Sequence, residues 1–197
     1  SATLKDGDRI RIGLEEFVFQ EVVDDPLLGT RIGNYQILER IGRGGMGAVY
    51  RAKQISMERD VALKVLDAKF AGRAGFVEGF MREARLAGKL QHPHLVGIHD
   101  FGNEGDRYFF SMEFIEGRNL MDDLESKGPL PPEQIVTYSM QIAKALSHAH
   151  ANNILHQDIK PRNILLTRAD EVKVADLGLA RVMACGEHDE PHEAMGT

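Results

Sequence analysis

Apolar and polar residues follow two periodicities along this chain, one typical of strands and one typical of helices. Residues 4–13 and 16–20 alternate apolar and polar positions around a short turn, which predicts a β-hairpin. Strands are also expected at 48–52, at 61–66 and at the alternating 172–174. Apolar residues recur near helical spacing in three further segments, 76–87, 120–126 and 132–151. The mixture predicts an α+β fold.

Composition and charge narrow the classes of protein. The 197 residues are 43% hydrophobic and 27% charged, as in soluble globular proteins. The net charge of −6 argues against a general nucleic-acid binder. The single cysteine, Cys185, excludes an internal disulfide and fits a reducing compartment, so a cytoplasmic location is expected. No apolar stretch approaches the length of a membrane span and no signal peptide is visible, although an anchor outside this segment stays open.

A glycine run, Gly42-x-Gly44-Gly45-x-Gly47, is the first candidate for chemistry. Glycines without a Cβ let the backbone approach phosphates closely. Ordinary turns and dinucleotide-binding folds use the same residues, so the run alone is weak. A dinucleotide-binding loop opens a helix, however, whereas the β-branched and aromatic residues at 48–52 predict a strand. This favours a glycine-rich hairpin.

Lys64 is a charged residue inside an otherwise apolar strand, 61–66. Burying an ammonium group there requires a partner carboxylate or phosphate. The candidate carboxylate is Glu83, which lies on the predicted helix 76–87 beside its apolar face. A solvated helix charge is the alternative interpretation of Glu83.

A second polar group stands between apolar runs, where Asp158, Lys160 and Asn163 follow one another closely. The pattern predicts a short polar loop held between buried strands. A carboxylate, an ammonium group and an amide are together suited to a site that accepts the proton of a hydroxyl group and also binds a metal ion and a phosphate. Asp176 follows the strand 172–174 and precedes a glycine, a position that is often only a turn.

In this order the motifs resemble those of the eukaryotic-type protein kinases. The segment from His156 to Asn163 resembles the catalytic loop H-R-D-x-x-x-x-N, with Gln157 in place of the arginine. Lys160 followed by Pro161 resembles the serine/threonine branch, and the glycine run resembles bacterial members. The resemblance implies a bilobal fold with a β-rich small lobe and a helical large lobe.

The resemblance also implies a role for each candidate residue. Asp158 would orient a substrate hydroxyl and accept its proton, while Lys160 would steady the γ-phosphate. Lys64, paired with Glu83, would hold the α- and β-phosphates. Asn163 and Asp176, the latter followed by Leu177 where phenylalanine is usual, would hold Mg²⁺. The further ATP contacts that it implies, including the gatekeeper Met112 and the hinge, are Ile41, Gly42, Gly44, Gly45, Gly47, Val49, Ala62, Met112, Glu113, Ile115 and Leu165.

The implied function is a protein serine/threonine kinase that transfers the γ-phosphoryl group of Mg·ATP to a hydroxyl of a protein substrate. Gln157 has no charge to receive a phosphate, and residues 177–196 contain no Ser, Thr or Tyr, so activity independent of phosphorylation in this segment is expected. A pseudokinase or nucleotide-binding scaffold is the second interpretation, because Gln157 and Leu177 depart from the pattern. A metal site around Cys185 is an alternative to a solvated loop there.

The expected organisation is a hairpin at 1–25, a linker at 26–33, a kinase small lobe at 34–115 and part of a large lobe at 116–197. The hairpin, at residues 4–20, resembles the last strands of a forkhead-associated domain; a simple N-terminal extension is the alternative. The sequence ends within what resembles the activation segment, so this form is expected to be weakly active. Uncovered apolar faces would promote self-association or poor stability, and the hairpin would pair with a sheet edge of its own lobe or of another copy.

Overall fold

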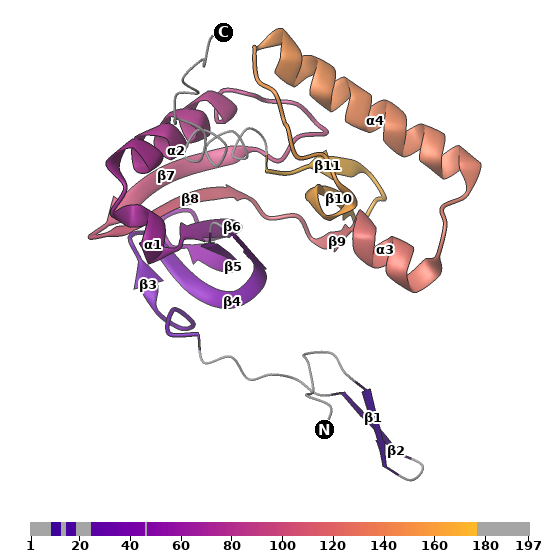
Figure 1. Ribbon diagram of the computed structural model, residues 1–197, viewed down its shortest axis with the longest axis horizontal. Helices are drawn as coiled ribbons and strands as arrows, with labels where there is room; N and C mark the ends of the chain where they lie inside the picture. The colour runs from indigo at the N-terminus through magenta and orange to yellow at the C-terminus, as the bar shows by residue number, and fades with distance from the viewer. Residues whose placement is uncertain (1–8, 13–14, 19–24, 46, 177–197) are drawn as a thin grey trace, which may run out of the picture.

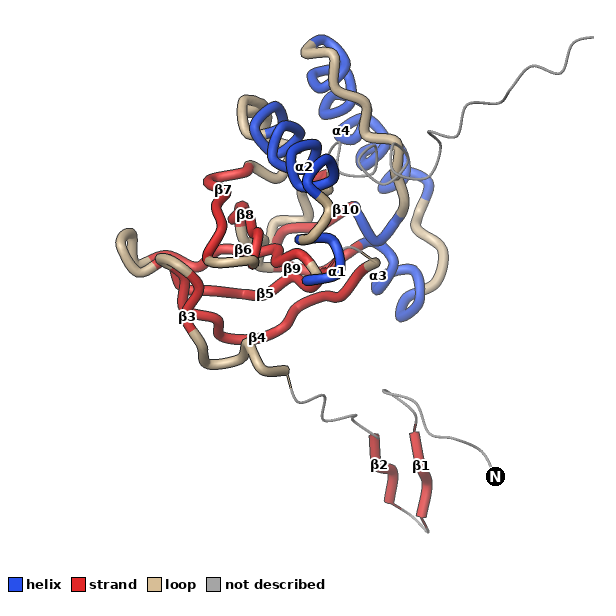
Figure 2. The backbone as a smooth tube through the Cα atoms, turned by 60° about the vertical axis from the view of Figure 1, so that its left-hand side comes forward, coloured by secondary structure: helices blue, strands red, loops and turns tan. Residues whose placement is uncertain are grey.

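The computed structural model describes residues 9–12, 15–18, 25–45 and 47–176, and residues 25–176 form two lobes (Figure 1). The small lobe, residues 25–113, is built on a curled antiparallel sheet of six strands in the order β3-β4-β5-β6-β8-β7. Its strands are β3 (Arg31–Ile32), β4 (Tyr35–Gly44), β5 (Gly47–Gln54), β6 (Arg59–Leu66), β7 (Ile98–Glu104) and β8 (Arg107–Glu113). The helices α1 (Ala68–Ala71) and α2 (Ala74–Ala87) connect β6 to β7 (Figure 2).

The described part of the large lobe, residues 117–176, combines two helices with a three-stranded antiparallel sheet in the order β11-β10-β9. Its elements are β9 (Gly117–Asn119), α3 (Leu120–Lys127), α4 (Pro132–Ala151), a short 3-10 helix η1 (Pro161–Asn163), β10 (Ile164–Thr167) and β11 (Val172–Val174). A β-bridge between Leu95 and Val174, together with the bonds Val96 N to Val174 O (2.9 Å) and Val174 N to His94 O (2.9 Å), joins the two lobes.

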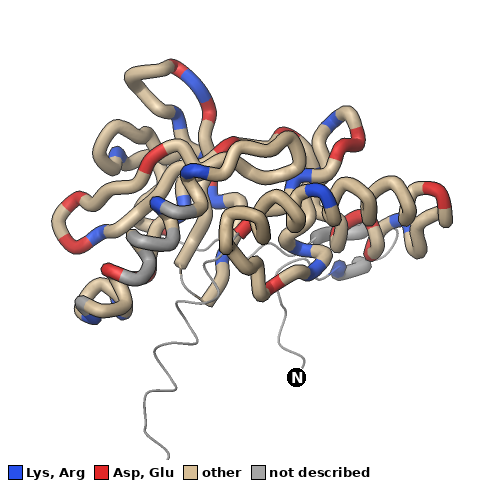
Figure 3. Tube along the Cα trace, turned by 90° about the horizontal axis from the view of Figure 1, so that it is seen from above, with Lys and Arg blue, Asp and Glu red and all other residues tan. Residues whose placement is uncertain are grey.

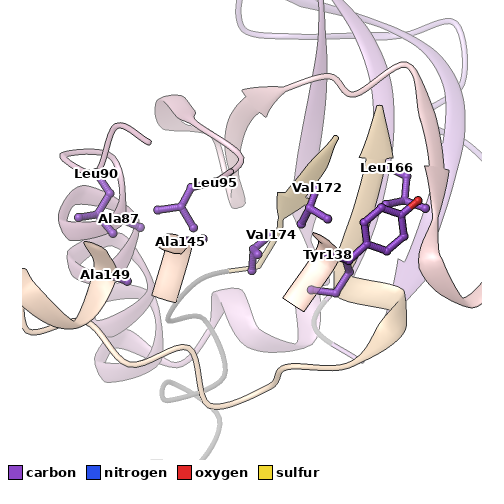
Figure 4. Close-up of a cluster of buried hydrophobic side chains, with 10 residues drawn as sticks. Ala87, Leu90, Leu95, Tyr138, Ala145, Ala149, Leu166, Val172 and Val174 are labelled. Carbon is purple, nitrogen blue, oxygen red and sulfur yellow. The ribbon is translucent and has the colours of Figure 1, made fainter. Parts of the chain in front are cut away.

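Each lobe has its own apolar core. In the small lobe, Ile32, Tyr35, Ile37, Leu63 and Phe109 pack between the strands and are almost completely buried. In the large lobe, the inner face of α4 packs on the small sheet, as Figure 4 shows for a set of buried residues that includes Tyr138, Ala145, Leu166, Val172 and Val174. The helix begins at proline, whose fixed φ suits a first turn, and its inner residues recur at helical spacing.

The structure confirms most of the elements that the periodicity predicts. The helix expected at 132–151 is α4 (Pro132–Ala151), and the helix expected at 120–126 is α3, one residue longer at its C-terminal end. The strands expected at 48–52, 61–66 and 172–174 are confirmed within β5, β6 and β11.

Residues 26–33 are not the linker that the sequence predicts; they fold as part of the small lobe. Ile32 is fully buried in the small-lobe core, and β3 pairs with the start of β4. Gly29 N donates to Ile37 O (3.2 Å), and Ile37 N donates to Thr30 O (2.9 Å). The proline and glycines in this stretch build turns that fold it back on the sheet, and the apolar residues between those turns find a core to fill.

The N-terminal hairpin is confirmed as a pair of antiparallel strands, β1 (Arg9–Ile12) and β2 (Glu15–Val18). These strands form a two-stranded sheet of their own, so the expected pairing with an edge of the small-lobe sheet is wrong for the described residues. The edge nearest along the chain is β3, which has only two residues and offers few main-chain groups. Pairing with another copy stays a prediction.

Two surface features bear on the earlier expectations. Acidic and basic residues are interspersed along the described trace (Figure 3), with pairs such as Arg51–Asp60 at 2.6 Å. The outer side of α4 exposes Ile135, Val136 and Met140, the kind of apolar surface that favours association, although self-association itself stays a prediction.

Among the residues described, no helix is both long and apolar enough to cross a bilayer.

Candidate active site

The glycine run forms the turn between β4 and β5. A β-carbon on Gly47 would lie 2.0 Å from the carbonyl oxygen of Val65, so glycine is required for β5 to approach β6 at this point. The loop therefore ends beside the strand that carries Lys64. Because residues 48–52 continue as a strand, the dinucleotide-binding alternative, which needs a helix there, is excluded.

Most of the apolar residues among the expected ATP contacts come together in a single cluster between the lobes. Its members include Val49 on β5, Ala62 on β6, Met112 on β8, Ile115 after β8 and Leu165 on β10. They pack with the buried Phe110 and Ala175. Five predicted residues from distant parts of the chain thus share one environment, whereas Ile41 is exposed on β4 and lies outside this cluster.

Glu113 connects the segment between the lobes to the strand that leads to Asp176. Its carboxylate pairs with Lys173 Nζ at 2.9 Å, and its main-chain N–H donates to Gly97 O at 2.8 Å. A cavity of about 630 Å³ lies beside this segment. It is lined by residues 113–116, by Asp60 on β6 and by residues on either side of and within the turn between β10 and β11. It shares only Glu113 and Ile115 with the expected ATP contacts, so we do not assign it to the nucleotide.

The expected polar loop is present, but it follows a helix rather than a strand. Residues 152–160 have no regular structure and run from the end of α4 to η1. The apolar pair Ile154-Leu155, which suggested a strand before the loop, is too short to form one, and Leu155 is exposed. This part of the prediction is therefore wrong, while the strand after the loop, β10, is confirmed.

Asp158 contacts Lys160 and Asn163, the other two residues of the predicted polar loop. Its Oδ2 accepts from Lys160 Nζ at 2.6 Å and from Asn163 Nδ2 at 3.1 Å. Asn163 Nδ2 also donates to the main-chain oxygen of Asp158 at 2.8 Å. The Lys160 contact, followed by that of Asn163, holds the pKa of Asp158 below its ordinary value. The carboxylate is therefore ionised at neutral pH.

His156 has a positioning role that sequence reasoning missed. The ring is buried, its Nε2 lies 2.8 Å from Ala175 O, and its Nδ1 accepts from Asp158 N at 3.3 Å. Ala175 N in turn donates to Asn163 O at 2.9 Å. The residue before Asp176 is thus tied to the Asp158 loop through both of its main-chain groups. The only sequence signal was a histidine within the motif, because its partner lies far along the chain.

Lys64 forms an ion pair with Asp176, Nζ to Oδ1, at 2.8 Å. The lysine side chain is 12% exposed and the aspartate 34%, so the ammonium group has the anion that its burial requires. The side chain of Glu83, on α2, lies outside the described residues, and its contact with Lys64 stays a prediction. The expectations for Leu177, Cys185 and the rest of 177–197 also lie outside them.

Comparisons with known proteins agree with this geometry. A family profile for the protein kinase domain matches residues 35–197. The chain is 41% identical over 172 residues to serine/threonine-protein kinase PrkC of Bacillus subtilis, covering 87% of this chain and 26% of that protein. The same figures hold for serine/threonine-protein kinase PknD of Mycobacterium tuberculosis. The chain therefore spans about a quarter of the length of these relatives.

Solved structures show the same fold. A crystal structure of the Mycobacterium tuberculosis PknI kinase domain superposes with a TM-score of 0.69 at 30% identity. The match covers 77% of this chain and 62% of that one. Over most of its length the chain thus shares the fold of a known kinase domain.

Proposed function

Because this chain belongs to the protein kinase family, we propose that it carries the nucleotide site and the catalytic loop of a serine/threonine kinase. The enzyme would transfer the γ-phosphoryl group of ATP to a serine or threonine hydroxyl of a protein substrate. One observation carries the proposal: Asp158 and Asp176 are held together through Ala175, while Asp176 contacts Lys64 on the other lobe. The residues needed at both ends of a phosphoryl transfer thus form one connected unit.

At the acceptor end, Asp158 is the base. Its lowered pKa keeps the carboxylate ionised, so that it orients the incoming hydroxyl and takes up its proton. Lys160, at 2.6 Å, brings a positive charge to the place where charge on the transferred phosphoryl group has to be balanced. Most of the rate enhancement comes from positioning and charge stabilisation.

At the donor end, the apolar cluster of Val49, Ala62, Met112 and Leu165 supplies a surface for adenine. The main-chain N–H of Glu113 donates to Gly97 O and its carboxylate pairs with Lys173, so neither group would be available to adenine. Lys64 would bind phosphate oxygens in place of Asp176.

Asp176 and Asn163 fit a magnesium ion. Mg²⁺ prefers oxygen ligands, commonly one or two carboxylates together with substrate phosphates. The amide nitrogen of Asn163 is used by Asp158, which leaves its amide oxygen as the remaining side-chain group. Bound there, the ion would supply positive charge to the phosphates. Among the described residues no group of three or more His, Cys, Asp and Glu could hold a metal, so nucleotide oxygens and water would complete the coordination.

A phosphotransfer assay on the full-length protein that contains this chain tests the proposal. Wild type should label a generic protein substrate with the γ-phosphate of ATP, whereas Asp158→Asn should bind ATP with unchanged affinity and transfer several hundredfold more slowly. Binding without transfer in the wild type would instead support a nucleotide-binding scaffold. That second candidate is favoured by Gln157, an exposed, uncharged residue where the kinase motif has arginine.

A further inference from the structure

A buried carboxylate from outside the matched kinase region contacts the base of the glycine loop. Asp25 precedes residue 35, where the family match begins, and its side chain is only 6% exposed. Tyr50 donates its hydroxyl to Asp25, with 3.2 Å to Oδ1 and 3.0 Å to Oδ2. Arg40 forms an ion pair with Asp25 Oδ2 at 3.3 Å. Asp25 therefore bridges two residues that belong to different strands.

Those two residues face each other in the sheet. Arg40 on β4 is the register partner of Tyr50 on β5, and the register shifts immediately afterwards, between Arg40 and Gly42. Beyond that shift the strands lead into the glycine loop. Asp25 therefore joins β4 and β5 at the last cross-strand pair before the register shift that lies nearest the glycine loop, where the ladder is locally disrupted.

The position of Asp25 is itself fixed by its own segment. Leu27 N donates to Asp25 Oδ1 at 3.1 Å, and Thr30 Oγ1 donates to Leu27 O at 2.7 Å. The pairing of β3 with β4 then anchors the end of this segment in the small-lobe sheet. The hydrogen bonds of a folded turn therefore fix the position of the Asp25 carboxylate.

The hydrogen bond from Tyr50 to Asp25 persists at neutral pH. Burial, followed by the hydrogen bond to Asp25, raises the pKa of Tyr50 to about 12, so the phenol keeps its proton and remains a donor. A buried carboxylate that loses a donor is costly, and hydrogen bonds to a charged group are stronger than neutral ones. Opening the strands at this point would separate Arg40 from Tyr50, so Asp25 would lose at least one of these two partners.

We propose that Asp25 is a positioning residue for ATP binding, which holds β4 and β5 together and thereby keeps the glycine loop in its nucleotide-binding conformation. This inference rests on the proposed function, because the loop would act on ATP. Asp25 touches no substrate; its effect passes through Arg40 and Tyr50. Loss of the bridge lowers the fraction of molecules with a binding-competent loop, and apparent affinity falls in proportion to that fraction.

Two variants and one matched control test the proposal in this chain. Asp25→Asn keeps the shape but removes the charge, and Tyr50→Phe removes only the hydroxyl. Each should weaken binding of a non-hydrolysable ATP analogue by about tenfold and speed hydrogen exchange of the amides at 42–47. The control is Tyr138→Phe, which also deletes a tyrosine hydroxyl that donates to an aspartate, Asp170 at 2.7 Å, but in the large lobe.

Tyr138→Phe should lower the melting temperature about as much as Tyr50→Phe, yet bind the ATP analogue like the wild type. If Asp25→Asn and Tyr50→Phe bind no more weakly than Tyr138→Phe, or leave exchange at 42–47 unchanged, Asp25 has a structural role only. A wild type that binds no ATP analogue would overturn the proposed function instead. The exchange measurement still decides in that case whether Asp25 holds the loop.

Discussion

Replacing Lys64 with methionine should separate nucleotide binding from folding. The ion pair with Asp176 spans 2.8 Å between a lysine that is 12% exposed and an aspartate that is 34% exposed. At an effective dielectric constant of about 20, two unit charges at this distance attract by about 6 kcal/mol. Burying the ammonium group costs several kcal/mol in lost hydration, which offsets most of that attraction. Asp176 also regains water once it is freed.

The net effect on folding should therefore be small. Methionine has nearly the length of lysine and is apolar, so it fills the same space beside the interlobe cluster. We expect the free energy of unfolding to fall by about 1–2 kcal/mol, a typical value for a single substitution. Nucleotide binding should respond far more strongly, because the variant leaves charged phosphates without their cation. Truncating one partner of a buried charge pair costs about 2–5 kcal/mol, which corresponds to at least a 30-fold loss of affinity.

Lys173→Met is the matched control. Lys173 is 17% exposed and pairs with Glu113 at 2.9 Å, which is close to the environment of Lys64. Its partner Glu113 is an expected contact at the hinge and not an expected phosphate contact. Urea denaturation and calorimetric titration with an ATP analogue should show similar losses of stability for both variants and a large loss of affinity only for Lys64→Met. Equal affinity of Lys64→Met and wild type would refute the role of Lys64. Equal losses of affinity in both variants would show that the effect is not specific to the phosphate site.

The catalytic loop and the β9–β10 contact supply three further tests. Phosphatase treatment of the full-length protein should leave its activity unchanged, because Gln157 carries no charge and residues 177–196 contain no Ser, Thr or Tyr; lost activity with a phosphosite mapped to this segment would contradict this. Lys160→Met should shift the acidic limb of the kcat/KM profile to higher pH, because Lys160 is the main cause of the lowered pKa of Asp158 and only the ionised carboxylate accepts a proton. An unmoved limb would assign that limb to another group. Gly117→Ala should cost about 1–3 kcal/mol in urea denaturation, because its β-carbon would lie 1.8 Å from a carbonyl oxygen of β10.

Sequence patterns alone were enough to predict most of the local elements and the family. The helix α4 has the predicted bounds because its apolar spacing and its N-terminal proline are both local signals. The strand after the glycine run could be predicted because β-branched and aromatic residues favour extended backbone. The order of the motifs identified the family, because several chemically constrained sites seldom occur together by chance.

Only the tertiary structure decided which charges meet. Lys64 was expected beside Glu83, but its described partner is Asp176, far along the chain. Several carboxylates satisfy the requirement that a buried ammonium has a counter-charge, and composition cannot rank them, because their distances depend on how the lobes pack. The role of His156 was hidden for the same reason, since its acceptor, Ala175 O, comes close only after α4 and β11 have packed together.

Residues 25–33, at the start of the small lobe, show the same limit of sequence patterns. Proline and glycine at 26–33 are typical of a linker, and the local pattern has no way to show that Ile32 fills a core or that Asp25 meets Arg40 and Tyr50. Turn residues specify that the chain bends, whereas the surface onto which it folds is made by other segments. The physical reason is that periodicity records the geometry of one element, while burial and charge pairing are properties of the contacts between elements.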